Sequence, residues 1–126
     1  YGYAVGLDMT RRDLQSAAKK LGRPWDMAKG FDNSAPCASI TKKEDIENIE
    51  SARIELKVND QIKQQSSIDH LIWSVPETIS FLSKLVELQP GDLIYSGTPD
   101  GVGTVTAGDY LYGTITGLSD LEINYK

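Results

Sequence analysis

The sequence contains one cysteine and one histidine, Cys37 and His70, among its 126 residues. A single cysteine cannot form an internal disulfide, so a reducing compartment is the simplest interpretation. Zinc sites in proteins are usually built from several cysteine and histidine ligands, which this sequence does not supply. Any bound metal is therefore expected to have oxygen ligands, which favours magnesium, manganese or calcium.

Basic residues are in the minority, and long apolar runs are missing. The 13 Lys and Arg residues are outnumbered by 18 Asp and Glu residues, which gives a net charge of -5. Nucleic-acid binding is disfavoured, because a basic surface supplies most of its energy. The apolar runs are far shorter than the ~20 residues that a membrane-spanning helix needs. We therefore predict neither a nucleic-acid partner nor a membrane partner for a chain of one domain at most.

The first 22 residues predict a strand followed by a helix. Larger and smaller side chains alternate from Tyr1 to Leu7, which is typical of a strand, and this run stops at Asp8. Thr10 is the expected N-cap of the helix and Gly22 the expected C-cap. The predicted apolar face of that helix consists of Leu14, Ala17, Ala18 and Leu21.

Arg11 and Arg12 fall in the first turn of this predicted helix. Cations are poorly placed there, because the helix dipole favours anions at its N-terminus. Two arginines at an unfavourable position, beside a carboxylate at the end of a strand, indicate that an anion binds close to Asp8.

The rest of the sequence alternates strand patterns with turns. We expect a polar connection over residues 41–52 and a mainly helical stretch over residues 66–86, in which Pro76 marks a break or a new helix start. Strands are expected at residues 37–40, at 93–97, at 110–116, at 121–125 and in a hairpin over 53–65 that turns at Asn59-Asp60. About six strands and two or three helices indicate an α+β, mainly β architecture.

Most of the remaining polar residues have ordinary explanations. Taken alone, Lys29 is best interpreted as a solvated lysine, since lysines are mostly exposed. His70 is expected to be a partly exposed structural residue, because adjacent helical residues such as Asp69 and His70 point about 100° apart. The glycine-rich loop at residues 97–103 is not a Walker loop, because no Lys-Ser/Thr follows it. Thr98 in this loop could offer its hydroxyl to a carboxylate.

Three segments, GLDMTRRDLQ, RPWDMAKGFD and GDLIYSGTPDGVG, resemble the fumarylacetoacetate hydrolase family and occur in its order. The resemblance implies a rolled mixed β-sandwich with peripheral helices. It also implies that residues 1–126 are the C-terminal part of a single catalytic domain. The N-terminal part of that domain would carry a Glu-x-Glu metal pair and a catalytic His–Glu pair upstream. Glu47 and Glu50 lie downstream with a different spacing, so they cannot replace the metal pair.

The resemblance also implies a role for individual residues. Asp8 would be a metal ligand, with Mg²⁺ as the expected ion and Mn²⁺ or Ca²⁺ as alternatives. Arg12 would fix Asp8 and neutralise the charge of the substrate, and Gln15 would hydrogen-bond a substrate oxygen or a ligand. Lys29 aligns with the active-site lysine of the family and would stabilise an enolate. Thr98 would hold the distal end of the bound carboxylate.

The function that follows is a metal-dependent hydrolase or lyase. It would cleave acylpyruvate-type β-keto acids at a carbon–carbon bond through a metal-stabilised enolate. The alternatives are a decarboxylase, isomerase or tautomerase of a related 2-oxo acid, such as oxaloacetate or 2-hydroxyhepta-2,4-dienedioate, and a catalytically inactive fragment or binding module. The resemblance also predicts a homodimer with a small 2-oxo acid as substrate. The expected location is the cytoplasm, or the mitochondrion in a eukaryote.

Overall fold

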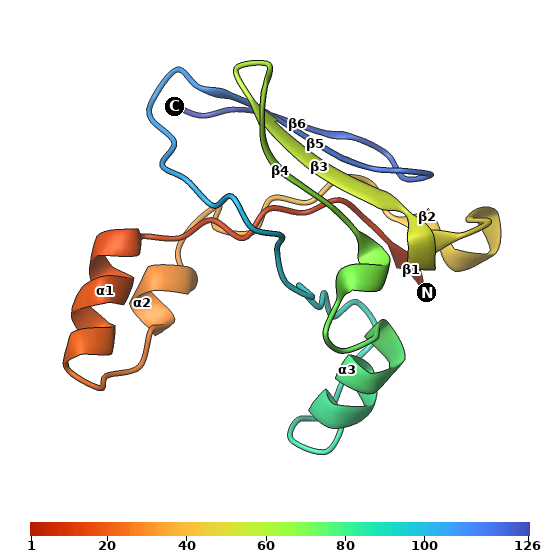
Figure 1. Cartoon of the computed structure of the whole chain (residues 1–126). Coiled ribbons are helices and arrows are strands. Elements are labelled where there is room, and N and C mark those ends of the chain that lie inside the picture. Colours follow the sequence, from red (N-terminus) through yellow and green to blue (C-terminus); the bar gives the residue numbers. More distant parts are fainter.

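The computed structural model describes residues 1–126 and contains six strands and three α-helices. The largest unit is a four-stranded sheet with the order β4-β3-β5-β6, in which every neighbouring pair is antiparallel (Figure 1). Its strands are β3 (Arg53–Val58), β4 (Gln61–Ser67), β5 (Tyr110–Ile115) and β6 (Leu121–Asn124). The mainly β architecture predicted from the sequence is confirmed, as are the hairpin and the two C-terminal strands.

The β3–β4 hairpin turns where the sequence predicts. Asn59 and Asp60 have φ values of 50° and 63°, and positive φ at both central residues is the requirement of a type I′ turn. The side chain of Asn59 also joins the hairpin to β5. Its Nδ2 donates to Asp109 Oδ1 over 2.7 Å, and its Oδ1 accepts from the backbone N of Tyr110 over 2.9 Å.

Asp109 makes the stability of this junction pH-dependent. Hydrogen bonds from the backbone N–H of Thr106 and from Asn59 hold the pKa of Asp109 below its ordinary value. A carboxyl group with a lowered folded-state pKa stabilises the fold above its unfolded-state pKa, and this contribution is lost as the pH falls. We therefore expect Asp109→Asn to lower the melting temperature at pH 7 and to have a smaller effect at pH 3. An equal loss at both pH values would contradict this assignment.

A small buried core lies where the N-terminal segment crosses the sheet. Val5 and Leu111 are almost fully buried, and a Cβ on Gly113 would lie 3.1 Å from Cγ1 of Val5. The short strand β1 (Gly2–Tyr3) pairs with β2 (Thr41–Lys42). The predicted strands at residues 1–7 and 37–40 are therefore too long or displaced, since only one isolated bridge, between Gly6 and Cys37, continues this pairing.

Helix α1 (Arg12–Lys20) confirms one predicted cap and contradicts the other. Gly22 has a φ of 60°, and the amides of Gly22 and Arg23 donate to the carbonyls of Lys19 and Ala18, which is a Schellman motif. Thr10 is not the N-cap, because Arg11 occupies that position and no side chain caps the helix. The Thr10 hydroxyl accepts a hydrogen bond from Lys29. The predicted apolar face is also not the buried one. Leu14 and Leu21 are exposed, whereas Gln15 is the buried residue of this helix.

The stretch over residues 66–86 is less helical than predicted. Ser66 and Ser67 still pair with β3, a 3₁₀ turn follows at Ile68–His70, and α3 begins only at Val75 (Val75–Leu82). Of the two predicted outcomes at Pro76, a break or a new helix start, the structure shows the new start, with Pro76 in the first turn of α3. Ser74 and Glu77 form a reciprocal capping box at that start.

Residues 93–105 contain no regular secondary structure, so the predicted strand at residues 93–97 is wrong. No backbone–backbone hydrogen bond involves these residues. The segment crosses the N-terminal segment between α3 and the pair formed by α1 and α2 (Asp26–Lys29), as Figure 1 shows. None of the helices of the chain combines the length and the apolar character that a transmembrane span requires.

Candidate functional site

The backbone holds Asp8 between two neighbouring segments. The amides of Leu7 and Met9, on either side of Asp8, donate to the carbonyls of Pro36 and Ser34 over 3.0 and 2.8 Å. Arg11 N then donates to the carbonyl of Ala28 over 3.0 Å, which brings helix α2 (Asp26–Lys29) next to this turn. The side chain of Asp8 is thereby directed from a fixed backbone, with the end of α2 within reach.

Lys29 and Asp8 form an ion pair at the start of α1. Lys29 Nζ lies 2.6 Å from Asp8 Oδ2 and 2.9 Å from Thr10 Oγ1. The two charged side chains are 35% and 50% exposed. Exposed ion pairs stabilise a fold by about 1 kcal/mol at most. The pair therefore does little to hold the fold together, and its accessible groups are available for binding.

Arg12 contacts Gln15 and not Asp8, which corrects the expectation that it fixes the carboxylate. Arg12 Nη1 donates to Gln15 Oε1 over 2.7 Å. Residues three apart on a helix are neighbours, so Arg12 finds this partner within its own helix. Gln15 is only 7% exposed. Arg12 uses one acceptor position of the Gln15 oxygen, and the amide nitrogen of Gln15 donates to no other side chain, so it can be offered to a ligand.

Arg11 has a structural explanation that the sequence did not reveal. Its guanidinium lies 4.3 Å from the centre of the Phe31 ring, which is a favourable cation–π distance. One of the two arginines at the start of α1 therefore has an aromatic partner. The anion predicted beside Asp8 stays a prediction that now concerns Arg12 and Lys29.

Thr98 comes from a different part of the chain. Its Oγ1 lies 2.7 Å from Nε2 of Gln64, and it makes no hydrogen bond to Asp8 or Lys29. Tyr95 links this segment to Gly6 and to the carbonyls of Ala35 and Pro36. The Tyr95 hydroxyl donates to the carbonyl of Ala35 over 2.7 Å, and a Cβ on Gly6 would lie 2.8 Å from the Tyr95 ring.

The environment of Tyr95 keeps its hydroxyl protonated. Burial raises the pKa of Tyr95 above its ordinary value, and the nearby Cys37 and Asp8 raise it further. His70 is the last residue of the 3₁₀ turn Ile68–His70, and this turn, which precedes α3, lies away from α1 and α2 (Figure 1). His70 is 74% exposed, with Ser66 Oγ 3.1 Å from its Nδ1, as expected for an exposed structural histidine.

The chain contains only part of a possible metal site. No three side chains of His, Cys, Asp or Glu lie close enough together to hold an ion. Asp8 could supply one ligand to such a site. Its Oδ2 accepts a hydrogen bond from Lys29, whereas its Oδ1 has no hydrogen-bond partner. Mg²⁺ and Ca²⁺ bind several oxygen ligands, so a single carboxylate does not complete the site.

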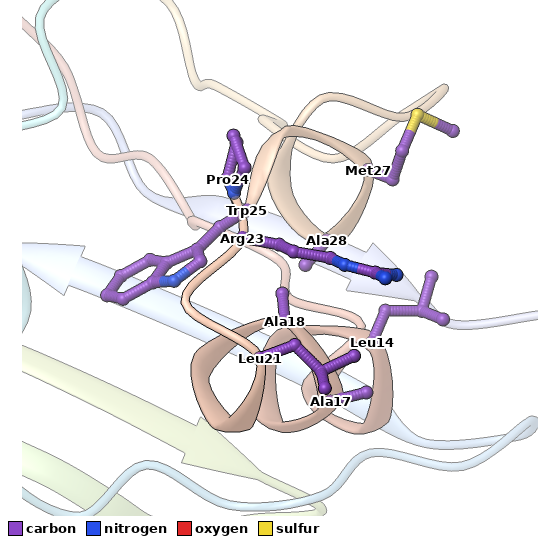
Figure 2. A pocket seen from close by; sticks show the side chains of 9 residues that line it. All are labelled: Leu14, Ala17, Ala18, Leu21, Arg23, Pro24, Trp25, Met27 and Ala28. Carbon is purple, nitrogen blue, oxygen red and sulfur yellow. The ribbon is translucent and has the colours of Figure 1, made fainter.

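A shallow apolar groove of about 210 Å³ lies between α1 and α2. Figure 2 shows its lining, which includes Leu14, Leu21, Trp25 and Met27. Neither Asp8 nor Lys29 contributes to it. The groove is therefore separate from the polar cluster and is a poor match for a charged 2-oxo acid.

Thr10 and Gln64 were not assigned to the site from the sequence, but each forms a hydrogen bond with a residue that was. The Thr10 hydroxyl accepts from Lys29 and donates to the carbonyl of Asp8 over 3.3 Å. Gln64 bonds Thr98 across 34 residues of sequence. Thr10 carried a helix-cap signal, and Gln64 lies in a run of polar residues typical of a solvated strand, so no local pattern could identify either role.

Comparison with known proteins adds a family to this geometry. Residues 1–124 match the model of the fumarylacetoacetate (FAA) hydrolase C-terminal family. A fumarylpyruvate hydrolase from Ralstonia is 50% identical over 98% of this chain and 64% of its own length. A mitochondrial oxaloacetate tautomerase from rice is 42% identical over 99% of this chain and 55% of its own length. The chain thus spans between half and two thirds of the length of these curated relatives.

Solved structures give the same result. One match is the structure of fumarylpyruvate hydrolase from Pseudomonas aeruginosa in complex with Mn²⁺ and pyruvate. Its sequence is 49% identical to this chain, and the TM-score is 0.96 over 99% of this chain and 54% of that one. A fumarylpyruvate hydrolase-like protein from Burkholderia cenocepacia gives a TM-score of 0.94 at 47% identity, over 97% of this chain and 53% of that one. The expected fold is confirmed. The chain belongs to the fumarylacetoacetate hydrolase family and matches the C-terminal part of its members.

Proposed function

We propose that the protein containing this chain is a metal-dependent enzyme that cleaves acylpyruvate-type 2-oxo acids, with fumarylpyruvate as the first substrate to test. The observation that carries the proposal is the cluster of Lys29, Asp8 and Thr10, in which an accessible ammonium group lies beside a carboxylate with one free oxygen. The similarity to a fumarylpyruvate hydrolase over nearly the whole chain supports the choice of substrate.

Asp8 is the residue of this chain that would hold a divalent cation. Mg²⁺ is the ion we propose, and the Mn²⁺ bound to the similar fumarylpyruvate hydrolase makes Mn²⁺ the first alternative, followed by Ca²⁺. A bound cation would supply positive charge that polarises the oxygens of a 2-oxo acid. The remaining ligands would come from residues outside this chain.

Lys29 would stabilise negative charge that develops on the substrate. Its ammonium group has three hydrogens, of which two are given to Asp8 and Thr10, so one remains for a substrate oxygen. Arg12 uses one guanidinium nitrogen on Gln15 and keeps further donors for a substrate carboxylate. Thr98 would bind the distal end of that carboxylate. A preorganised donor of this kind is often worth about 3–4 kcal/mol in the transition state.

A general base is the function that this chain does not supply. His70 is exposed and lies away from the cluster, and no other histidine is present. We propose that a base from an upstream segment completes a single catalytic domain, with residues 1–126 as its C-terminal part. We also propose that the protein is a homodimer of the cytoplasm, or of the mitochondrion in a eukaryote, like the relatives named mitochondrial.

Oxaloacetate tautomerisation is the second candidate function. It is favoured by the oxaloacetate tautomerases of rice and human, which are 42% and 43% identical over 99% of this chain. Tautomerisation only moves a proton, so it would use the same ammonium and carboxylate cluster without attack by water. Decarboxylation of a related 2-oxo acid needs the same charge stabilisation, and an inactive binding module needs none of it.

A substrate panel distinguishes these functions. The full-length protein would be assayed with fumarylpyruvate, other acylpyruvates and oxaloacetate, in Mg²⁺ or Mn²⁺ and in EDTA. We expect metal-dependent loss of acylpyruvate well above the metal-only background. Rapid keto–enol exchange of oxaloacetate without acylpyruvate cleavage would identify a tautomerase, and CO₂ release would identify a decarboxylase. Binding without any turnover would contradict the enzymatic proposal.

A further inference from the structure

We infer that Gln64 is a positioning residue. It holds Thr98 in place, so that the Thr98 hydroxyl donates a hydrogen bond to a carboxylate of the substrate. The part that concerns the substrate rests on the function proposed above. The observations behind it are the burial of Gln64, the direction of its hydrogen bonds and the close contact between β4 and the glycine-rich loop.

Gln64 is a buried amide that reaches from the sheet to the loop. It lies on β4 and is only 9% exposed. Its Nε2 lies 2.7 Å from Thr98 Oγ1 and 2.7 Å from the carbonyl oxygen of Pro99. A buried polar group costs free energy unless it is hydrogen-bonded. The two bonds together satisfy both hydrogens of the amide nitrogen.

The direction of these bonds follows from chemistry. The carbonyl oxygen of Pro99 can only accept, so the Gln64 atom that contacts it is the amide nitrogen and not the amide oxygen. The same nitrogen therefore donates to Thr98. A hydroxyl that accepts from Gln64 retains its own hydrogen for another partner, and Thr98 has no other hydrogen-bond partner in the chain. Thr98 is exposed, so this hydrogen is available to an anion.

The loop is pressed against β4 beside this contact. Gly101 has a φ of 99°, and a Cβ at this position would lie 2.0 Å from the carbonyl oxygen of Lys63. Because residues 93–105 make no backbone–backbone hydrogen bonds, their position depends on side chains. The side-chain hydrogen bonds that join these residues to the rest of the chain are those of Gln64 and of Tyr95. Gln64 is thus the contact that fixes the glycine-rich end of the segment.

Gln64→Glu tests the direction of the bond in the full-length protein. A carboxylate of almost the same shape accepts from Thr98, which turns the Thr98 hydrogen away from the substrate. We expect KM for the 2-oxo acid to rise roughly tenfold or more, with a smaller change in kcat, because a hydrogen bond to a charged group is lost. Gln64→Met leaves the Thr98 hydrogen free and should raise KM less. Gln65→Glu is the matched control, since Gln65 is exposed and has no side-chain hydrogen bond; it should leave KM unchanged.

A double-mutant cycle with Thr98→Val separates positioning from general destabilisation. If Gln64 acts through Thr98, Gln64→Glu should add little to the KM increase of Thr98→Val. Additive effects, or equal KM values for Gln64→Glu and Gln65→Glu, would overturn the inference.

A measurement without substrate keeps this inference separate from the proposed function. We expect a broad-specificity protease to cleave residues 97–103 faster in Gln64→Glu and Gln64→Met than in the wild type or Gln65→Glu, at temperatures well below unfolding. An unchanged cleavage rate would show that Gln64 does not hold the loop, even if the enzyme is active. Faster cleavage in a protein without 2-oxo acid turnover would instead refute the proposed function and retain Gln64 as the residue that holds the loop.

Discussion

Replacing Lys29 with methionine is expected to lower kcat by roughly 10²-fold or more while KM changes less. Methionine keeps much of the length of the side chain and removes the ammonium group that contacts Asp8 and Thr10. If Lys29 stabilises an enolate, its interaction grows in the transition state, so its loss appears in kcat. Steady-state kinetics with the substrate identified in the panel would measure the effect.

Lys20→Met is the matched control for this experiment. Lys20 lies in the last turn of α1 and has no ion pair or side-chain hydrogen bond, so its loss removes the same charge without touching the cluster. We expect its kinetics to equal those of the wild type. If Lys29→Met raises KM and leaves kcat intact, Lys29 only binds an anion.

Replacing Asp8 with asparagine is expected to weaken Mg²⁺ and Mn²⁺ binding by more than about 100-fold, because an anionic oxygen ligand is lost at a site that needs several. Asparagine has nearly the same shape and can still accept a hydrogen bond from Lys29. Since exposed ion pairs contribute about 1 kcal/mol at most, the melting temperature should change little. Calorimetric titration of the full-length protein with each metal would measure the change in affinity.

Asp13→Asn makes the same chemical change five residues away and provides the control. Asp13 lies in the first turn of α1 and is exposed. We expect it to leave the metal affinity unchanged. Equal metal affinities for Asp8→Asn and the wild type would remove Asp8 from the metal site and with it the present form of the proposed mechanism.

Local turn chemistry explains which parts of the fold could be predicted. The hairpin at Asn59-Asp60 and the C-cap at Gly22 follow from residues that tolerate positive φ, and both are present. The predicted strand at residues 93–97 fails for a different reason. An extended pattern identifies extended backbone, but a strand also needs a neighbour to pair with, and local sequence does not specify that neighbour. This segment pairs with no other backbone segment of the chain, so no strand forms there.

The structure brings together only some of the residues that the sequence suggested for the candidate site. The structure brings Asp8 and Lys29 together, although they are 21 residues apart. It does not bring Arg12 to Asp8, because the neighbouring turn of the helix offers Gln15. The roles of Thr10 and Gln64 depend on partners from other segments, so they could not be predicted. The individual roles of Asp8, Arg12, Gln15, Lys29 and Thr98 stay predictions until the variants are measured.

The order of strands in the large sheet has a consequence for how the site is assembled during folding. β3 and β4 are joined by a two-residue turn and can pair early, whereas β3 and β5 meet only when residues some 50 apart in sequence, such as Asn59 and Asp109, come together. Closing a long loop costs chain entropy before its contacts form, so β5 should dock in a later and slower step. The segment that carries Thr98 lies within that loop. Gln64 is therefore placed in the hairpin that forms early, and Thr98 contacts it only after β5 has paired with β3. A chain that stopped folding before that step would expose one edge of β3 to pairing with other chains.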